Sequence, residues 1–321
     1  MRVAITGATG FVGRGITRYL SQHREYALRV AVRGPYSSPD SATEVITMPS
    51  IEPDSNWASF VGDAQVVIHA AARVHVMHDS ASNPEDEYFR VNVAATLNLA
   101  EQAAAAGVRR FIFISSIKVN GEATDPGSPF TADQAANPSD PYGVSKTRAE
   151  EGLRQIAARS AMEVVIIRPV LVYGPGVKAN FLSMMHWLEK GIPLPLGAIN
   201  NRRSLVALDN LVDLVVTCIR HPAAANQTFL VSDGNDLSTT QLLRHMARAL
   251  GKPARLLPVP MWLLKVAALV VGKGSFSQRL CGSLQVDIAK TCTMLAWTPP
   301  VSVEDAMNAT AHYFLEHKDD D

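Results

Sequence analysis

The sequence has few cysteines and no excess of charge of either sign. Cys218, Cys281 and Cys292 form no CxxC pair, which argues against a disulfide framework and against a cysteine-rich zinc site. Lys and Arg number 30, as do Asp and Glu, so the formal net charge is zero and the chain has no global basic field for nucleic acid. Unpaired thiols in a chain of 321 residues are typical of a reducing compartment, so we expect a cytoplasmic protein.

Long hydrophobic runs are also missing. The N-terminus leads directly into a short strand-like run, without the apolar stretch of an export signal. The most apolar stretch, Met261 to Val271, is too short to cross a bilayer and contains Lys265. We interpret it as a buried or interface helix and expect no insertion into a membrane. His75 and His78 have no carboxylate or Cys at ligand spacing, so no metal site is expected.

Short apolar runs alternate with helical patterns through the first half of the chain. Hydrophobic residues make up 47% of the sequence, enough for a sizeable core. Strands are expected at 3–6, 28–32, 66–69, 110–115 and 164–168, and helices at 11–22, 57–60, 87–106 and 141–158. This alternation predicts an α/β fold, a doubly wound parallel sheet over residues 1–170 with helices on both faces. Beyond it, mixed elements between Gly and Pro breakers predict a smaller mixed α/β domain over residues 171–321.

A glycine turn lies between the first strand and the first helix. Gly7, Gly10 and Gly13 have the spacing GxxGxxG, with Phe11 and Val12 opening the helix. Glycine lets the backbone approach a pyrophosphate closely, and a helix N-terminus offers free N–H groups. The strand–turn–helix context therefore predicts a dinucleotide site. The turn lacks the GK[ST] ending of a P-loop.

Two other strand ends bear on the same cofactor. Small residues, Ala70, Ala71 and Ala72, follow the strand at 66–69 and would let a cofactor lie close over the sheet edge. Arg33 stands at the end of the second strand, where NAD-binding folds usually place an acidic residue. Because a guanidinium can hold a 2′-phosphate, we expect NADP(H) to be favoured, with NAD(H) as the alternative.

Tyr142 and Lys146 lie one helical turn apart. Ser139 or Asp140 can cap this helix, and Pro141 suits its first position. An unperturbed Tyr has a pKa near ~10, and a nearby ammonium favours the phenolate, so the pair can serve as a proton donor or acceptor. A serine pair, Ser115 and Ser116, ends the strand before this helix and can bind the same substrate oxygen.

Together these residues resemble the extended short-chain dehydrogenase/reductase family, in its nucleotide-sugar epimerase/dehydratase branch. The resemblance covers nearly the whole chain and adds the run from Arg168 to Gly176 to the motifs above. It implies a Rossmann domain to which a later segment, around 204–220, returns, and a C-terminal domain that binds the nucleotide sugar. By resemblance Tyr142 is the acid/base, Lys146 lowers its pKa and binds the nicotinamide ribose, and Ser116 binds the reacting oxygen. Asn92 falls where the family supports the cofactor site.

The resemblance also implies a UDP-sugar substrate. Asn180 falls where the branch contacts the nucleotide, and Arg203 matches the Arg that holds the diphosphate. Arg279 lies in the stretch that closes over the nucleotide. Lys118 and His75 are expected to point toward the sugar pocket. Family members often dimerise through two helices, which here are the ones predicted at 87–106 and 141–158, so a homodimer is suggested by analogy.

A narrower resemblance is to bacterial surface-polysaccharide enzymes that reduce C4 of UDP-2-acetamido-2,6-dideoxy-4-hexulose. The strings that carry it run from Ser115 to Glu122, Pro193 to Gly197 and Phe229 to Gly234. The alternative is a UDP-glucose or UDP-N-acetylglucosamine 4-epimerase with tightly bound NAD. Such epimerases usually carry an acid where this chain has Arg33, and tend to have Asn where it has Leu171. Both departures favour the 4-reductase.

Overall fold

Seven parallel strands form the main sheet of the computed structural model, which describes residues 1–38, 40, 42–48, 50–74, 84–125, 127–270 and 280–318. Their order is β3-β2-β1-β4-β5-β6-β9, and every neighbouring pair is parallel. The strands are β1 (Arg2–Thr6), β2 (Ala27–Val32), β3 (Glu44–Thr47), β4 (Val66–His69), β5 (Arg110–Ile114), β6 (Glu163–Pro169) and β9 (Thr228–Val231).

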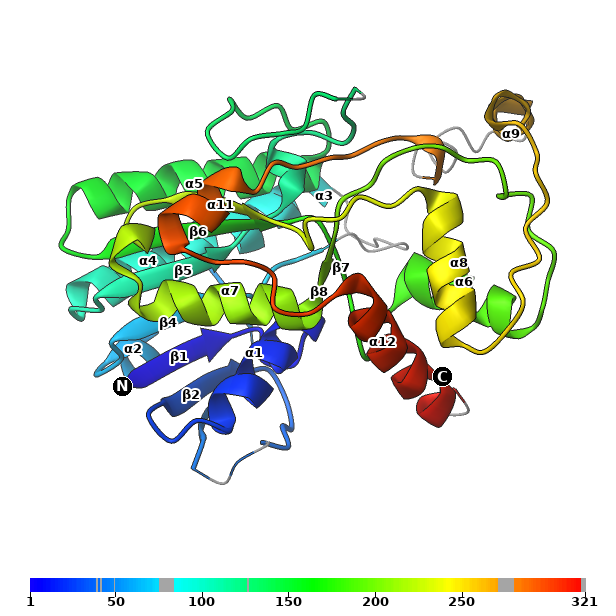
Figure 1. Ribbon diagram of the computed structural model, residues 1–321. Coiled ribbons are helices and arrows are strands. Elements are labelled where there is room, and N and C mark those ends of the chain that lie inside the picture. The colour runs from blue at the N-terminus through cyan, green and yellow to red at the C-terminus, as the bar shows by residue number, and fades with distance from the viewer. Residues whose placement is uncertain are drawn as a thin grey trace.

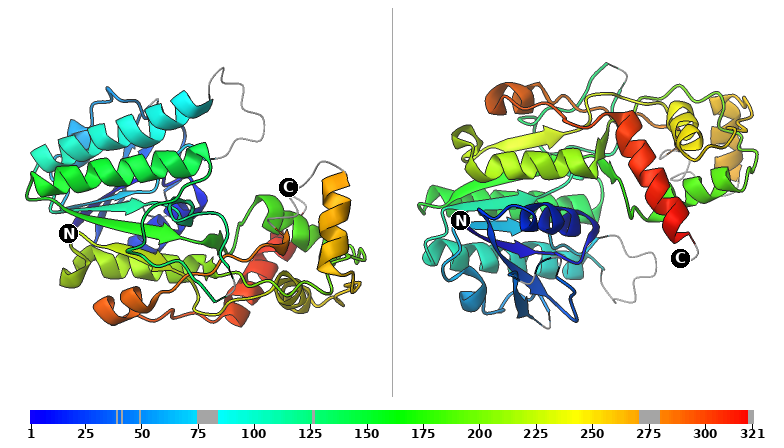
Figure 2. Two further views of the ribbon diagram at one scale, coloured as in Figure 1. Left: turned by 90° about the horizontal axis from the view of Figure 1, so that it is seen from above. Right: turned by 60° about the horizontal axis from the view of Figure 1, so that its bottom comes forward.

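Helices cover both faces of this sheet (Figures 1 and 2). One face is covered by α2 (Ala58–Val61), α4 (Ala95–Ala105) and α5 (Pro141–Ala158), and their apolar residues share one cluster with the strands. The other is covered by α1 (Phe11–Ser21), α7 (Leu208–Arg220) and α11 (Ala289–Leu295). The predicted doubly wound α/β fold is thus confirmed.

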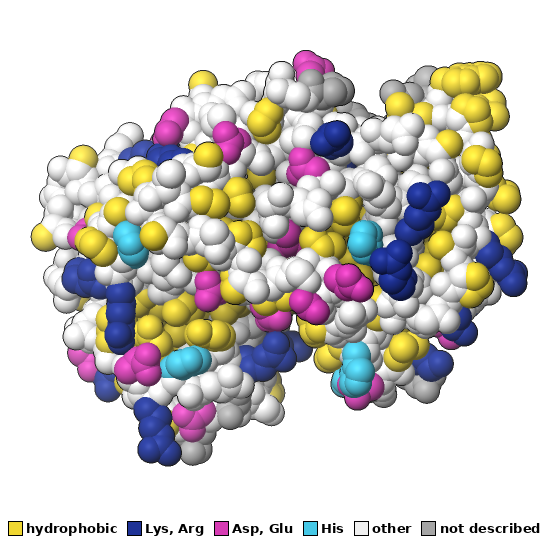
Figure 3. Space-filling model, in the orientation of Figure 1, with side chains coloured by type: hydrophobic (Ala, Val, Ile, Leu, Met, Phe, Trp, Pro, Cys, Tyr) yellow, Lys and Arg dark blue, Asp and Glu magenta, His cyan; other side chains and the backbone are white. Residues whose placement is uncertain are grey.

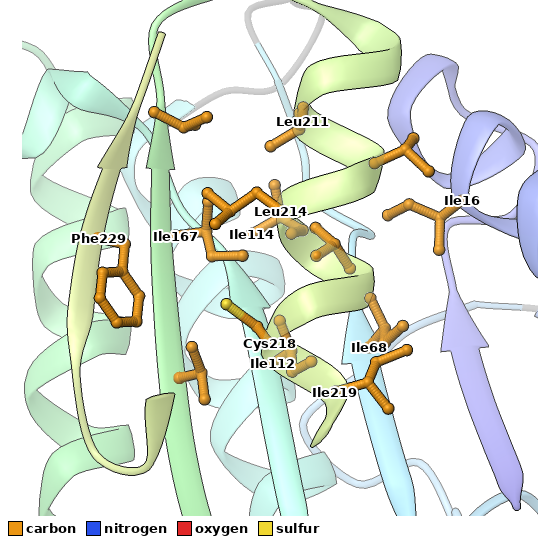
Figure 4. Packing of buried hydrophobic residues seen from close by; sticks show 14 of the residues in the cluster. Ile16, Ile68, Ile112, Ile114, Ile167, Leu211, Leu214, Cys218, Ile219 and Phe229 are labelled. Carbon is orange, nitrogen blue, oxygen red and sulfur yellow. The ribbon is translucent and has the colours of Figure 1, made fainter. Parts of the chain in front are cut away.

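The helix α7 lies across the middle of the sheet and fixes the larger core. Leu211, Leu214 and Cys218 face the sheet residues Ile112 and Ile167 (Figure 4), and all five are fully buried. Burying a side chain of this size stabilises a fold by about 1.5–3 kcal/mol. Strand β9 and helices α7 and α11 thus bind the C-terminal half of the chain to the sheet.

The helix predicted at 87–106 forms, and it contains a π-helical turn. Helix α3 (Pro84–Tyr88) passes into a π-helical turn, η1 (Phe89–Ala94), before α4 begins. Helix α4 ends as expected, because Gly107 adopts φ +79°, a left-handed conformation that favours glycine. Such π-helical turns often occur at functional sites.

A second, smaller core lies beyond the carboxyl edge of the sheet. Its elements are β7 (Leu171–Tyr173) paired with β8 (Leu205–Ala207), and the helices α6 (Ala179–Glu189), α8 (Thr239–Ala249) and α12 (Val303–His317). Tyr173, Met185, Leu243 and Met307 are buried in it. The predicted division at residue 170 stays a prediction, and α7, β9 and α11 beyond it pack with the main sheet. Within the described residues, no helix is long and apolar enough to cross a membrane.

Candidate active site

Three neighbouring strands present the candidate residues at one edge of the sheet. The strands β1, β4 and β5 are adjacent and parallel, so their carboxyl ends meet. The Gly7 turn follows β1, Ala70 follows β4, and Ser115 follows β5. The chain order reverses between β1 and β4, and open α/β sheets bind ligands in the crevice at such a switch point.

The glycine turn is built as the spacing predicts. Gly7 has φ +76°, and a Cβ there would stand 2.6 Å from the backbone nitrogen of Ala71. A Cβ at Gly13 would stand 2.1 Å from the carbonyl oxygen of Gly7. The turn therefore needs glycine at both positions, because it packs the start of α1 against the ends of β1 and β4.

The N-terminus of α1 suits a diphosphate. Its N-cap, Gly10, supplies no side-chain hydrogen bond, and its first turn holds no acidic residue. By contrast, Asp140, Ser238 and Ser302 cap the N-termini of α5, α8 and α12 with their side chains. Uncapped N–H groups and the positive end of the helix dipole favour an anion at this place. The residues present therefore fit a bound dinucleotide.

Arg33 follows the last residue of β2 and is exposed. Strands β1 and β2 pair in parallel from Arg2 to Thr6, so their carboxyl ends lie side by side. Arg33, just after β2, therefore lies at the same edge of the sheet as the glycine turn after β1, as predicted. The residue at this strand end is thus a base and not the acidic residue usual in NAD-binding folds.

Ser116, Tyr142 and Lys146 come together at the end of β5. Helix α5 begins as predicted, with Pro141 in the first turn and Asp140 as the N-cap, its carboxylate accepting from the Gly143 N–H at 2.6 Å. The Ser116 side chain interacts with Tyr142 and acts to lower the pKa of the tyrosine. The Lys146 ammonium lies 6.0 Å from the centroid of the Tyr142 ring.

Burial dominates the electrostatics of this trio. Lys146 donates from Nζ to the Ile114 carbonyl oxygen at 2.9 Å and lies 4.4 Å from the centroid of the Phe113 ring. Burial lowers the pKa of Lys146 to about 7 and raises the pKa of Tyr142 to about 12. The pKa of Tyr142 is thus raised, opposite to the expected depression, because desolvation disfavours both charged forms. Tyr142 is held as a neutral phenol, the form that donates a proton.

Asn92 lies in the π-helical turn and joins three segments of the site. Its side chain accepts from the Arg73 N–H at 2.8 Å and donates to the Arg73 carbonyl oxygen at 3.0 Å. It also donates to Ser145 Oγ at 3.0 Å, and Ser145 donates to the Tyr142 carbonyl oxygen at 2.8 Å. The wider turn of η1 thus places Asn92 where it ties the segment after β4 to the first turn of α5.

A buried ionic network, which the sequence did not predict, holds Ser115 at the end of β5. The Glu150 carboxylate, fully buried, accepts from Ser115 Oγ at 2.6 Å and from Arg168 Nε and Nη2 at 2.9 and 2.6 Å. Arg168 also donates to Asn120 Oδ1 at 2.9 Å. The signal for it was the single Glu among the inward positions of helix 141–158, four residues after Lys146.

His69, at the end of β4, is a packed core residue. Its ring lies 5.9 Å from Phe113 in a stacked arrangement, and its nitrogens are hydrogen-bonded to Thr6 and Thr96 at 2.7 and 2.9 Å. Burial lowers the pKa of His69 to about 3, so its ring stays neutral. Over the described ranges of the chain, no group of three His, Cys, Asp or Glu side chains could hold a metal ion.

The residues predicted to contact the substrate lie in different environments. Lys118 is ion-paired to Asp140 and Glu122, so its charge already has carboxylate partners at the rim of α5. Asn180 is exposed in the first turn of α6. Arg203 is partly buried and donates to the Gly282 carbonyl oxygen at 3.1 Å, and burial lowers its pKa. Arg279 and His75 lie outside the described residues.

The chain is similar in sequence to known proteins. The family model described as "NAD dependent epimerase/dehydratase family" matches residues 3–232. A "UDP-glucose 4-epimerase" of Vibrio cholerae is 49% identical over 98% of this chain and 95% of its own length. An "N-acetyl-alpha-D-glucosaminyl-diphospho-ditrans,octacis-undecaprenol 4-epimerase" of Escherichia coli O157:H7 is 26% identical over 76% of this chain and 77% of its own.

Among solved structures, a UDP-glucuronic acid 4-epimerase from Bacillus cereus in complex with NAD superposes with a TM-score of 0.79 at 20% identity, covering 98% of this chain and 99% of that one. At this identity the likeness establishes the fold. Neither the family description nor these relatives support the predicted preference for NADP over NAD.

Proposed function

The chain belongs to the NAD dependent epimerase/dehydratase family, an extended short-chain dehydrogenase/reductase enzyme family, and from this premise we propose that it oxidises and reduces C4 of a UDP-sugar. The observation that carries the proposal is the meeting of Ser116, Tyr142 and Lys146 beside the glycine turn. Bound nicotinamide dinucleotide supplies the hydride acceptor and donor for such chemistry.

We assign the proton transfer to Tyr142. Its phenol and the hydroxyl of Ser116, which interacts with it, would hold the C4 oxygen of the sugar between them. As a neutral phenol, Tyr142 donates its proton to a C4 ketone, and it takes the proton back when the alcohol is oxidised. Lys146, fixed by the Ile114 carbonyl, stabilises the phenolate formed in the first direction.

The role we favour is that of a UDP-glucose-type 4-epimerase. Its support is the Vibrio cholerae relative at 49% identity, together with the family description as NAD-dependent. An epimerase returns the hydride to the opposite face of C4, so it needs no net supply of reducing nucleotide. The Escherichia coli relative's name describes a sugar diphosphate on a lipid, so the sugar 1-diphosphate is the part common to both substrates.

The second candidate is a 4-reductase of UDP-2-acetamido-2,6-dideoxy-4-hexulose that uses NADPH. Two observations favour it. Arg33 is exposed where an acid would hold an NAD ribose, and Leu171 is half exposed at the start of β7 where 4-epimerases tend to have Asn. A reductase must exchange its nucleotide at each turnover, whereas an epimerase retains it.

One experiment separates these candidates. The purified protein is denatured and its supernatant analysed by mass spectrometry for NAD or NADP, and the native protein is then given UDP-glucose with no added nucleotide. Retained NAD and formation of UDP-galactose support the epimerase. Loss of NADPH absorbance with the 4-keto sugar, absent with UDP-glucose, supports the reductase, and Arg33→Asp should then shift preference toward NADH. Inactivity with both substrates would contradict the proposal.

Arg203 and Asn180 remain our proposed contacts for the UDP group, and Lys118, which is ion-paired to Asp140, remains our proposed neighbour of the sugar. A homodimer through the helices at 84–105 and 141–158 also remains a proposal. Phe89 and Val144, on these helices, are 57% and 42% exposed, which supports it. A cytoplasmic location agrees with three cysteines that form no disulfide.

A further inference from the structure

Hydrophobic side chains are exposed together on α9 (Met261–Val270) and the loop before it. Leu257, Trp262, Leu263 and Val266 are 52%, 66%, 44% and 50% exposed, and we call these four the α9 patch. They are four of the eleven large hydrophobic side chains found exposed over the described residues, yet they lie within ten positions of one another. Scattered exposed hydrophobic residues need no explanation, but a cluster of this kind marks an interaction surface.

The helix presents two different faces. Met261 and Leu264 pack against the smaller core, whereas Trp262, Leu263 and Val266 point away from it on one side of the helix. The loop is held by backbone bonds, from the Leu257 N–H to the Leu194 carbonyl oxygen at 2.8 Å and from the Gly197 N–H to the Leu257 carbonyl oxygen at 2.9 Å. The α9 patch is therefore attached to the fold and stands at its outer corner (Figure 1).

The segment of the chain that contains the α9 patch is basic. Residues 237–286 contain seven Lys and Arg and no Asp or Glu, although the whole chain has 30 of each kind. Four of these bases, Arg244, Arg248, Lys252 and Arg255, are exposed on α8 and the following loop. In the described part of the chain none of the four forms an ion pair. Figure 3 shows hydrophobic side chains at the corner formed by α9, with Lys and Arg over the neighbouring α8.

We propose that the α9 patch docks this enzyme on the surface of an anionic lipid bilayer. A helix with Trp and aliphatic side chains on one face and Lys and Arg around it suits the boundary between headgroups and acyl chains. Anionic lipids attract the basic residues, and the acyl region covers the apolar ones. A second copy of the chain fits the charges worse, because it would bring two acid-free segments together.

The test is vesicle flotation of the full-length protein. Vesicles of equimolar phosphatidylglycerol and phosphatidylcholine are compared with vesicles of phosphatidylcholine alone, at low and high salt. We expect binding to the anionic vesicles that is weakened by salt, and little binding to the neutral ones. The triple variant Trp262→Gln, Leu263→Gln, Val266→Gln should lose at least about tenfold in partition coefficient. The matched control, Val45→Gln with Leu315→Gln, removes exposed hydrophobic residues elsewhere and should bind normally.

A charge variant tests the other half of the proposal without touching α9. Arg248→Gln with Lys252→Gln should weaken anionic binding by about fivefold for each charge, whereas Arg18→Gln with Arg24→Gln should not. Circular dichroism and the melting temperature check that each variant is folded. The proposal is overturned if the wild type fails to float with anionic vesicles, or if the triple variant floats as well as the wild type. A dimer that the triple variant converts to a monomer, without vesicle binding, would instead identify a protein interface. Activity with any sugar nucleotide is not needed for either result.

Discussion

Replacing Glu150 by alanine should destabilise the protein by about 3–5 kcal/mol, the cost of leaving one partner of a buried ion pair unpaired. Glu150 and Arg168 are almost fully buried, with side-chain exposures of 1% and 4%. The substitution removes both hydrogen bonds from Arg168, the bond from Ser115 and the ion pair with the half-exposed Arg154. The bond from Arg168 to Asn120 cannot neutralise the guanidinium, because the amide carries no charge.

The assay is thermal unfolding of the purified protein at neutral pH. In large domains one kcal/mol shifts the melting temperature by roughly 2–4 °C, so we expect a fall of roughly 6–20 °C. A comparison variant, Glu101→Ala, breaks the ion pair with Arg159, whose side chains are 49% and 64% exposed. Its cost should stay within about 0–1 kcal/mol.

A double variant separates the unpaired charge from the loss of packing. Glu150→Leu with Arg168→Met removes both charges and keeps apolar volume, so it should be more stable than Glu150→Ala. Should Glu150→Ala melt within a degree or two of the wild type, or the double variant melt well below the single one, the reasoning about an unpaired buried charge is refuted.

Three further predictions concern the active site itself. Tyr142→Phe should lower turnover by about 10²–10⁴-fold with little change in melting temperature, and unchanged turnover in a steady-state assay would remove the acid/base role. Because burial lowers the pKa of Lys146 to about 7 from its ordinary 10.5, the unfolded chain binds more protons between these pH values. Stability should therefore rise with pH through this window, and urea unfolding at about pH 7 and about pH 9 should show a smaller rise in Lys146→Met. Gly13→Ala should cost about 1–3 kcal/mol and weaken nucleotide binding by calorimetry, since its Cβ would meet the Gly7 carbonyl oxygen; normal binding would contradict the tight turn.

Local signals in the sequence determined much of the fold. The start of helix 141–158 follows from Asp140 as a cap and Pro141 in the first turn, and both features depend on neighbouring residues alone. The glycine turn is similar, because the closeness of Gly7 and Gly13 arises within one strand–helix unit. Element order and apolar runs then sufficed to predict a doubly wound sheet.

Long-range contacts decided the rest. Residues 228–231 are a short apolar run that could belong to a strand or a helix, and only pairing with β6 makes them the last strand of the sheet. The π-helical turn at 89–94, which brings Asn92 to Ser145, interrupts a segment whose sequence reads as one plain helix. Lys118 was expected to point to the sugar, but its pairing with Asp140 became visible only once α5 was placed beside it.

Burial is what a linear sequence reports least well. From Met261 onward the apolar run was interpreted as a buried or interface helix, and the structure leaves Trp262 and Val266 exposed because only one side of α9 meets the smaller core. The pKa values of Tyr142 and Lys146 depend on desolvation by residues distant in sequence, so the spacing of the pair could not give their direction. The sequence determined which groups face one another within a helix or turn, whereas the tertiary structure decided how much water each of them keeps.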